Sequence, residues 1–230
     1  MERIILIETS TALCSAALAE NGAIVSYRES SAPKAHASLT AVFIQEMLAE
    51  KGLTIADCDA VCVSMGPGSY TGLRVGVSTA KGLCFGSGKP LLAVGTLDTL
   101  VEQADDAAHD QTDGLKYVIP MVDARRMEVY TAVFENRVQT TQTAPAIIDE
   151  NSFADLLEQG PCLFIGDGAG KCADVIKHPN ARFCQCWPKA SAMLVPAMKA
   201  YKEKRFEDVA YFEPFYLKEF VATVSKKKLF

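Results

Sequence analysis

The sequence predicts an α/β protein made of two related halves. Short apolar runs of strand length alternate with longer helical segments along the 230 residues, an order typical of the α/β class. Three strands, a helix, a strand and a helix follow one another in the first half, and the second half shows the same succession. This shared order, without a visible repeat of sequence, predicts a duplicated domain with a cleft between two lobes.

The first lobe, residues 1–105, begins with three predicted strands. Apolar runs, with the turn Asn21-Gly22 between two of them, indicate an antiparallel meander. A helix then ends at Gly52, a strand leads into a glycine-rich turn, and Gly88-Lys89-Pro90 breaks a second helix. The predicted strands cover residues 4–8, 14–20, 23–29, 60–65 and 91–94, and the predicted helices cover 36–51 and 71–85.

The second and smaller lobe, residues 106–230, follows an acidic, turn-prone segment at 105–114. A new meander is predicted there, followed by alternating helices and strands. The turn Gly166-Asp167-Gly168-Ala169-Gly170 separates a strand from a short helix. The predicted strands cover residues 117–123, 128–134, 138–143, 162–165 and 182–186, and the longer helices cover 152–158 and 190–204.

Charge and hydropathy exclude some classes of protein. The formal net charge of -5 and the isoelectric point of about 5.3 exclude a generally basic surface of the kind that binds nucleic acid non-specifically. The basic run Lys226-Lys227-Lys228 is either a solvated tail or a contact for tRNA. The sequence contains neither a signal-peptide pattern nor an apolar run of membrane-spanning length, so we expect a soluble cytoplasmic protein without membrane contact.

No residue pattern predicts a catalytic or metal site. His36, His109 and His178 are dozens of residues apart, and none has a carboxylate or cysteine at a ligand spacing. Cys184 and Cys186 lack a second pair that would complete a zinc site. Most of the other cysteines stand singly in apolar runs and are predicted to be reduced core residues. We therefore predict no catalytic residue, no metal ligand and no cofactor.

The turn Gly66-Pro67-Gly68-Ser69-Tyr70-Thr71-Gly72-Leu73-Arg74 is the most distinctive motif. A strand that ends in such a turn before a helix presents backbone N–H groups to an anion or to another protein. The motif does not match a phosphate-binding P-loop, because Gly72 follows Gly66 by six residues and is succeeded by Leu73 instead of lysine.

Three further turns carry polar candidates. Thr9 and Ser10, in the predicted turn after the first strand, have hydroxyls that would suit a phosphate or an ordinary polar turn. Gly168 would allow close approach of an adenine ring or a simple chain reversal. Asp123 follows a strand and is either a carboxylate at the cleft or a cap that accepts from its own backbone.

The helices at 36–51 and 71–85 are predicted to form a protein interface. The apolar arc of the first is wider than the single stripe that a sheet covers, and the second carries small residues at four-residue spacing. Each glycine inside a helix lowers helix stability by roughly 1 kcal/mol relative to alanine, so glycines at these positions need a packing reason. The alternative is that both helices pack only on their own sheet. The predicted interface residues are His36, Leu39, Thr40, Phe43, Met47, Gly72, Leu73, Gly76 and Ala80. Phe43→Asp or Gly76→Leu is expected to abolish assembly and leave the monomer folded.

Several motifs resemble the TsaB (YeaZ) family, a bacterial subunit of the machinery that makes threonylcarbamoyladenosine on tRNA next to the anticodon. The resemblance spans almost the whole chain. It is carried by the glycine-rich motif, Lys81-Gly82-Leu83, Ile5-Leu6-Ile7-Glu8-Thr9-Ser10, Val122-Asp123-Ala124-Arg125-Arg126, Glu128-Val129-Tyr130 and Pro214-Phe215-Tyr216-Leu217-Lys218. It implies an actin-like, sugar-kinase-like (ASKHA) fold of two lobes, with mixed sheets flanked by helices. Glu8 and Lys218 depart from the aspartate and arginine that relatives commonly have.

The resemblance also implies a scaffold subunit without catalysis of its own. Its expected partners are a TsaD-like catalytic subunit, a TsaE-like ATPase and, in their absence, a second copy of itself as a homodimer; tRNA is reached only through the complex. The catalytic relative has a metal-binding His-x-x-x-His shortly after Gly-Lys-Pro, where this chain has Thr96 and Leu100. Neither residue replaces imidazole as a metal ligand. The rival functions are a small-molecule kinase or ATP-binding protein of the same fold and, less closely, a metalloprotease.

Overall fold

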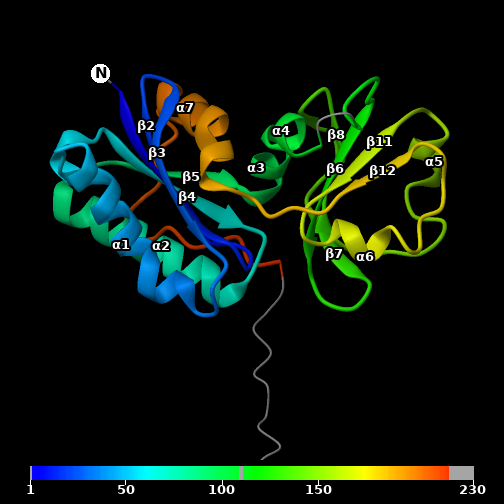
Figure 1. The fold of residues 1–230 in the computed structure, drawn as a ribbon, viewed down its shortest axis with the longest axis horizontal. Coiled ribbons are helices and arrows are strands. Elements are labelled where there is room, and N and C mark those ends of the chain that lie inside the picture. The colour runs from blue at the N-terminus through cyan, green and yellow to red at the C-terminus, as the bar shows by residue number, and fades with distance from the viewer. Residues whose placement is uncertain (1, 109–110, 218–230) are drawn as a thin grey trace, which may run out of the picture.

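The computed structural model describes residues 2–108 and 111–217. Its two β-sheets lie side by side, each with helices packed against it, so the molecule has two lobes (Figure 1). The predicted α/β class and the mixed sheets flanked by helices are therefore confirmed. His109, Lys218 and the lysines at 226–228 lie outside the described residues.

The first sheet has five strands in the order β3-β2-β1-β4-β5. The predicted meander is confirmed, since β1, β2 and β3 are antiparallel neighbours, while β4 and β5 run parallel to β1. Parallel neighbours need a crossover connection, and α1 and α2 provide the two crossovers. The bounds are β1 (Arg3–Glu8), β2 (Cys14–Glu20), β3 (Ala23–Ser30), α1 (Ala35–Glu50), the 3-10 helix η1 (Ile55–Asp57), β4 (Ala60–Gly66), α2 (Tyr70–Ser87) and β5 (Leu91–Gly95).

Both faces of this sheet are covered, because its central strand is apolar on both sides. Successive side chains of a strand point to opposite faces. Ile5 and Ile7 belong to the core cluster with α1 and α2, whereas Ile4 and Leu6 belong to the cluster with α7 (Leu194–Lys202). The continuous apolar run of β1 is thus the pattern of a strand buried on both faces.

The second sheet is also mixed. Its main path is β10-β7-β6-β11-β12, with β6, β11 and β12 parallel and β7 and β10 antiparallel. The predicted strand at 128–134 is two strands, because the chain leaves the ladder with β6 between them. The bounds are β6 (Tyr117–Asp123), β7 (Glu128–Thr131), β8 (Phe134–Glu135), β9 (Val138–Gln139), β10 (Ala144–Ile147), α5 (Ala154–Leu157), β11 (Cys162–Ile165), α6 (Ala169–Cys172) and β12 (Ala181–Cys184).

Two short helices between the lobes were not predicted. They are α3 (Thr96–Glu102) and α4 (Ala104–Ala108), and α4 lies partly in the segment expected to be a turn. Leu97, Leu100 and Val101 of α3 are buried in a cluster with residues of β6 and β11. Seven residues are too few for a clear helical period, so tertiary packing determines this helix more than its local pattern does.

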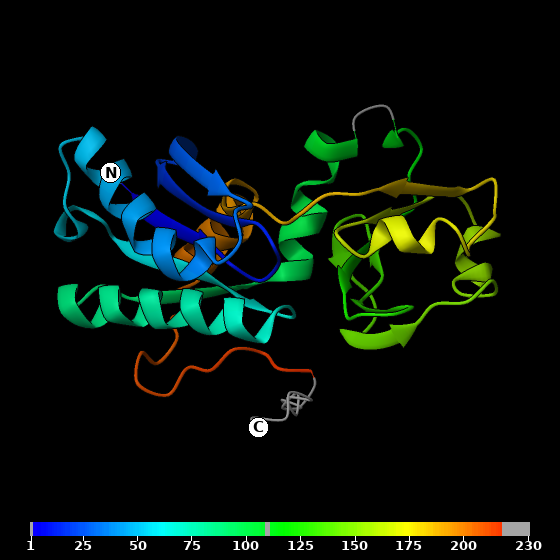
Figure 2. The ribbon, with the colours of Figure 1, turned by 60° about the horizontal axis from the view of Figure 1, so that its bottom comes forward.

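The end of the described chain returns to the first lobe. The 3-10 helix η3 (Ala190–Met193) and α7 pack in the core cluster that contains Ile4 and Leu6 of β1. The N–H of Ala190 donates to Ser15 Oγ at 2.9 Å. Residues 205–217 then run beside α2 (Figure 2). The boundary at residue 105 stays a prediction, and residues 190–217 pack against elements of the first lobe.

One property of the helices bears on membranes. Over residues 2–108 and 111–217, no helix combines the length and the apolar character that crossing a bilayer requires.

Candidate functional site

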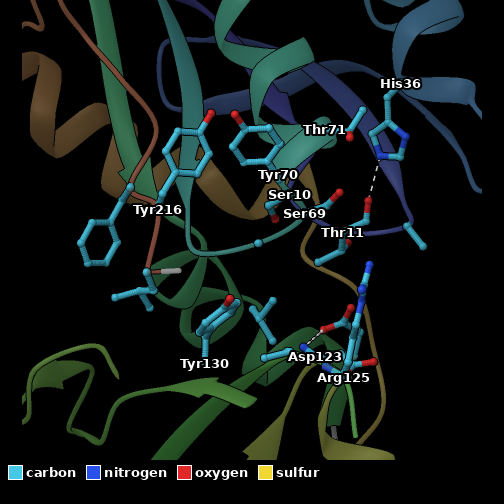
Figure 3. Close-up of a pocket in the computed structure, with 17 residues that line it drawn as sticks. Ser10, Thr11, His36, Ser69, Tyr70, Thr71, Asp123, Arg125, Tyr130 and Tyr216 are labelled. Carbon is cyan, nitrogen blue, oxygen red and sulfur yellow. Dashed lines mark hydrogen bonds between the residues drawn. The ribbon is translucent and has the colours of Figure 1, made fainter. Parts of the chain in front are cut away.

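A cleft of about 710 Å³ separates the two lobes (Figure 3). Its walls come from three parts of the chain: the β1–β2 turn with the start of α2, the β6–β7 turn, and the C-terminal segment. The lining residues are Ser10, Thr11, Ala12, His36, Gly68, Ser69, Tyr70, Thr71, Val122, Asp123, Ala124, Arg125, Tyr130, Asp167, Phe215, Tyr216 and Leu217.

The first wall contains the predicted polar turn after β1. Glu8, Thr9, Ser10 and Thr11 are all buried, and Ser10 and Thr11 line the cleft. The N–H of Ser10 donates to Glu8 Oε1 at 2.6 Å. In the part of the chain that the structure describes, the hydroxyls of Thr9, Ser10 and Thr11 and the second carboxyl oxygen of Glu8 have no hydrogen-bond partner. Burial raises the pKa of Glu8 to about 7.

The glycines of the distinctive motif hold this turn in place. A Cβ on Gly72 would lie 2.1 Å from the carbonyl oxygen of Thr9, and one on Gly76 would lie 2.2 Å from Thr9 Oγ1. The N–H of Ser69 donates to the carbonyl of Ser10 at 2.6 Å. The smooth strip of α2 is therefore filled by the chain's own β1–β2 turn, which gives Gly72 and Gly76 a packing reason inside the monomer.

The start of α2 and the first turn of α1 complete this wall. Ser69 caps α2, because its Oγ accepts from the N–H of Gly72 at 3.3 Å. His36 Nε2 lies 2.8 Å from the carbonyl oxygen of Thr11. This contact joins α1 to the β1–β2 turn, so the predicted interface residue His36 lies in the cleft wall.

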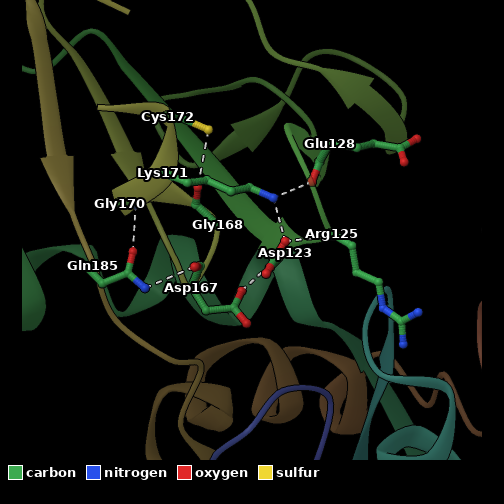
Figure 4. Close-up of polar contacts among 9 residues, drawn as sticks. All are labelled: Asp123, Arg125, Glu128, Asp167, Gly168, Gly170, Lys171, Cys172 and Gln185. Atoms are coloured by element: carbon green, nitrogen blue, oxygen red, sulfur yellow. Dashed lines mark hydrogen bonds and ion pairs between the residues drawn. The ribbon is translucent and has the colours of Figure 1, made fainter. Parts of the chain in front are cut away.

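The second wall is a polar network around Asp123 and Asp167 (Figure 4). Asp123 Oδ1 accepts from the N–H of Arg125 at 2.8 Å and from Lys171 Nζ at 2.5 Å. Lys171 also donates to the carbonyl of Glu128 at 2.7 Å. Asp123 thus caps its own turn and lines the cleft as well, so both predicted alternatives hold.

Asp167 fixes the two turns of this wall to each other. Its Oδ1 accepts from the N–H of Asp123 at 2.9 Å, and its carbonyl accepts from Gln185 Nε2 at 3.0 Å. Burial raises the pKa of Asp167 to about 6. Gly168 does not line the cleft. A Cβ there would lie 2.9 Å from Val129 Cγ1, so Gly168 serves close packing of the turn on β7.

The third wall is the C-terminal segment 214–217. The N–H of Phe215 donates to the carbonyl of Met65 at 2.7 Å, and the Tyr216 ring lies 4.8 Å from the Tyr70 ring, centroid to centroid. Lys81 Nζ donates to the carbonyls of Ala210 and Phe212 at 3.0 and 3.1 Å. This segment carries one of the family motifs, but its position in a cleft wall was not predicted from the sequence.

Most of the predicted interface residues pack inside the chain. His36 and Leu39 are partly exposed, and the other seven are buried. Phe43 and Met47 contribute to the core cluster between the helices and the sheet. Phe43→Asp would place a charge in this cluster, so the structure favours loss of folding over the folded monomer that the sequence led us to expect. The buried residues are Thr40, Phe43, Met47, Gly72, Leu73, Gly76 and Ala80.

The positions of the missing metal ligands are occupied by core side chains. The hydroxyls of Thr96 and Ser64 are 2.9 Å apart, and Leu100 is fully buried among apolar residues. In residues 2–108 and 111–217, no three histidine, cysteine, aspartate or glutamate side chains are grouped so that they could hold a metal ion. Cys184 and Cys186 carry free thiols.

Comparison with known proteins agrees with this architecture. The family model for TsaD, tRNA N6-adenosine threonylcarbamoyltransferase, matches residues 30–226. The chain is 29% identical over 228 residues to the tRNA threonylcarbamoyladenosine biosynthesis protein TsaB of Escherichia coli, covering 96% of each chain. It is 31% identical over 169 residues to TsaB of Bacillus subtilis, covering 71% of this chain and 70% of the relative.

Solved structures show the same fold. YeaZ from Pseudomonas aeruginosa superimposes with a TM-score of 0.79 at 25% sequence identity, over 94% of this chain and 100% of the other. The two-lobed, actin-like and sugar-kinase-like architecture that the motifs implied is confirmed. The chain therefore belongs to the TsaD family in the broad sense and, within it, to the TsaB (YeaZ) proteins of tRNA threonylcarbamoyladenosine biosynthesis.

Proposed function

We propose that this chain is a non-catalytic scaffold subunit that binds and supports a TsaD-like catalytic subunit in the cytoplasm. The assembly, completed by a TsaE-like ATPase, transfers threonylcarbamoyl to adenosine next to the anticodon of tRNA. Without the catalytic subunit, the same surface pairs with a second copy of the chain. The shared family model with a threonylcarbamoyltransferase supports a related subunit as the partner.

The outer face of α1 and α2 is the proposed docking surface, and Gly82 is the observation that carries it. Gly82 is exposed in the middle of α2, and a Cβ there would meet nothing within 4 Å. A glycine inside a helix destabilises it by roughly 1 kcal/mol relative to alanine, and no contact among residues 2–108 and 111–217 accounts for this one. Close approach of a partner's backbone does. The exposed residues of α2 one helical turn from it are uncharged, namely Ser78, Phe85 and Gly86, and Phe85 is an 87% exposed ring.

The side chains at positions 96 and 100 support the absence of catalysis in this subunit. The Thr96 hydroxyl is 2.9 Å from Ser64 Oγ, and Leu100 is packed in the core. Neither side chain offers the imidazole nitrogen that the catalytic relative is expected to use for its metal. The reaction accordingly belongs to the partner, and this chain contributes the docking surface.

A substitution on the proposed surface tests the scaffold function. Gly82→Arg fills open space, so the monomer stays folded, but it should abolish the complex with the catalytic subunit in size-exclusion chromatography with light scattering. Val195→Arg is the matched control, because Val195 is exposed on α7 at the opposite face of the sheet. A Gly82→Arg chain that assembles and supports tRNA modification as well as the control would refute the proposed surface.

The rival function is nucleotide binding in the cleft, and one observation favours it. Two buried hydroxyls of the cleft wall, those of Ser10 and Thr11, have no partner among the described residues. Such groups are available to a phosphate. Isothermal titration of the isolated chain with Mg-ATP separates the two functions, because micromolar binding supports the kinase-like function and no heat of binding supports the scaffold.

A further inference from the structure

The arginines of this chain fall into two groups. Five of the eight bind carboxylates or carbonyls of the chain itself: Arg3, Arg28, Arg137, Arg182 and Arg205. The side chains of Arg74, Arg125 and Arg126 have no carboxylate or carbonyl partner anywhere in residues 2–108 and 111–217. A set of arginines left without counter-charges is a surface that suits an anionic partner.

These three arginines are in or next to segments that line the cleft. Arg125 lines the cleft and Arg126 follows it in the β6–β7 turn, and both are exposed. Arg74 is in the first turns of α2, with its guanidinium 5.3 Å from the centroid of the Tyr70 ring, and Tyr70 is another cleft residue. Three arginines without an ion-pair partner among the described residues are therefore beside the mouth of the cleft, although the whole protein carries a charge of -5.

The acidic residues beside them form no ion pair with these arginines in residues 2–108 and 111–217. Asp123 is occupied by Lys171, as Figure 4 shows, and its other contact is with the backbone of Arg125. That contact fixes the turn and leaves the Arg125 guanidinium available. Asp167 in the cleft wall, Glu128 at the start of β7 and Glu213 near Tyr216 are further carboxylates on this side.

Aromatic side chains stand among the arginines. Tyr70, Tyr130 and Tyr216 all line the cleft, from three separate parts of the chain (Figure 3). Tyr216 keeps 37% of its surface exposed. The backbone that precedes it is anchored by the Phe215-to-Met65 hydrogen bond and by the contacts of Lys81 with Ala210 and Phe212. A half-exposed ring on a fixed backbone loses little conformational entropy when a planar group stacks on it.

We propose that the mouth of the cleft binds an unpaired segment of RNA, with Arg125 and Arg126 contacting phosphates and Tyr216 stacking on a base. Phosphate contacts by arginine and base stacking on aromatic rings together are how proteins hold single-stranded nucleic acid. The inference rests on the proposed function, in which tRNA is the substrate of the complex. It adds a direct contact between this subunit and the RNA, whereas the motif resemblance implied contact only through the partners.

The test measures tRNA binding by the complex of this chain with its catalytic subunit, by fluorescence anisotropy across a range of salt concentrations. Arg125→Ala/Arg126→Ala should weaken binding and reduce the slope of log K against log salt by roughly 1.4, since each phosphate contact to a single strand contributes about 0.7. Tyr216→Ala should weaken binding by about 5- to 150-fold, the range for one stacked base, while Tyr216→Phe keeps the affinity. Lys177→Ala/Lys202→Ala, which removes the same charge from exposed positions elsewhere, is the control.

The outcomes separate this inference from the proposed function. If the double arginine variant assembles normally and its affinity and salt slope equal those of the control, the RNA site is refuted while the scaffold stands. If that variant loses the catalytic subunit, the arginines bind protein carboxylates and the RNA site is also refuted. If the unaltered complex does not modify tRNA at all, the proposed function fails first.

Discussion

Gly72→Ala is the substitution that tests most directly how the cleft wall is built. The added methyl carbon would lie 2.1 Å from the carbonyl oxygen of Thr9, where real Cβ contacts do not fall below 3.0 Å. The β1–β2 turn or α2 must therefore move by about 0.9 Å. The turn cannot move freely, since Ser10 is held by two hydrogen bonds. Its carbonyl accepts from the N–H of Ser69, and the N–H of Ser10 donates to the Glu8 carboxylate.

The magnitude follows from two opposing effects. Forcing an extra methyl group into a packed site typically lowers the free energy of unfolding by about 1–3 kcal/mol. Alanine in place of glycine inside a helix raises the free energy of unfolding by up to about 1 kcal/mol. Gly82→Ala, in the same helix, has the second effect alone, because a Cβ at that position meets nothing within 4 Å. The two variants should thus differ by about 1–3 kcal/mol in the free energy of unfolding, with Gly82→Ala the more stable.

Urea unfolding followed by circular dichroism measures this difference. With a denaturant slope of about 2 kcal/mol per molar, the transition midpoints should be separated by roughly 0.5–1.5 M. The same glycine-to-alanine change is made in both proteins, so effects on the unfolded chain cancel to a first approximation. Equal midpoints would show that the turn yields at no cost, and the account of Gly72 as a packing residue would have to be abandoned.

Two further substitutions have clear expected outcomes. In Glu8→Gln, the pH dependence of stability should flatten. The carboxyl of Glu8 has a pKa that rises from 4.5 to about 7 on folding, so it binds its proton more tightly in the folded state, and the free energy of unfolding of the parent should fall by roughly 3 kcal/mol as pH rises from 4.5 to 7. Urea midpoints that change equally in both proteins between pH 5 and pH 8 would contradict this. Phe43→Asp should fail to fold, because Phe43 is only 8% exposed and removal of such a ring alone lowers the free energy of unfolding by about 3–5 kcal/mol. A folded monomer by circular dichroism would contradict the place of Phe43 in the core.

The sequence predicted the strands of the first lobe and their succession along the chain because each has a plain local signal. Apolar runs bounded by turns such as Asn21-Gly22 mark β1, β2 and β3. The helix α3 had no such signal, since its burial against β6 depends on residues that are distant in sequence. Similarly, β7 and β8 were predicted as one strand, because only their pairing with β6 shows where the chain leaves the sheet between them.

The cleft shows a sharper limit of sequence reasoning. Spacing on a helical wheel identified the smooth strip of Gly72, Gly76 and Ala80, but it does not say what fills that strip. The filling group is Thr9, more than sixty residues earlier in the chain. Gly82 and Gly76 look alike in the sequence, and only the structure distinguishes the open glycine from the packed one. Tyr216 joins the cleft through a returning segment that no local pattern reveals.

These placements make α2 the common element of the two proposed surfaces. Its inner side holds the β1–β2 turn through Gly72 and Gly76, its first turn places Tyr70 in the cleft, and its outer side presents Gly82. A partner bound at Gly82 would therefore rest on the same rigid helix that shapes one wall of the cleft. If both surfaces act as proposed, Gly82→Arg should abolish assembly while tRNA binding by the isolated chain, however weak, keeps its dependence on Arg125 and Arg126. The two surfaces are separable because Gly82 is on α2 outside the lining of the cleft, whereas Arg125 and Arg126 are in the β6–β7 turn.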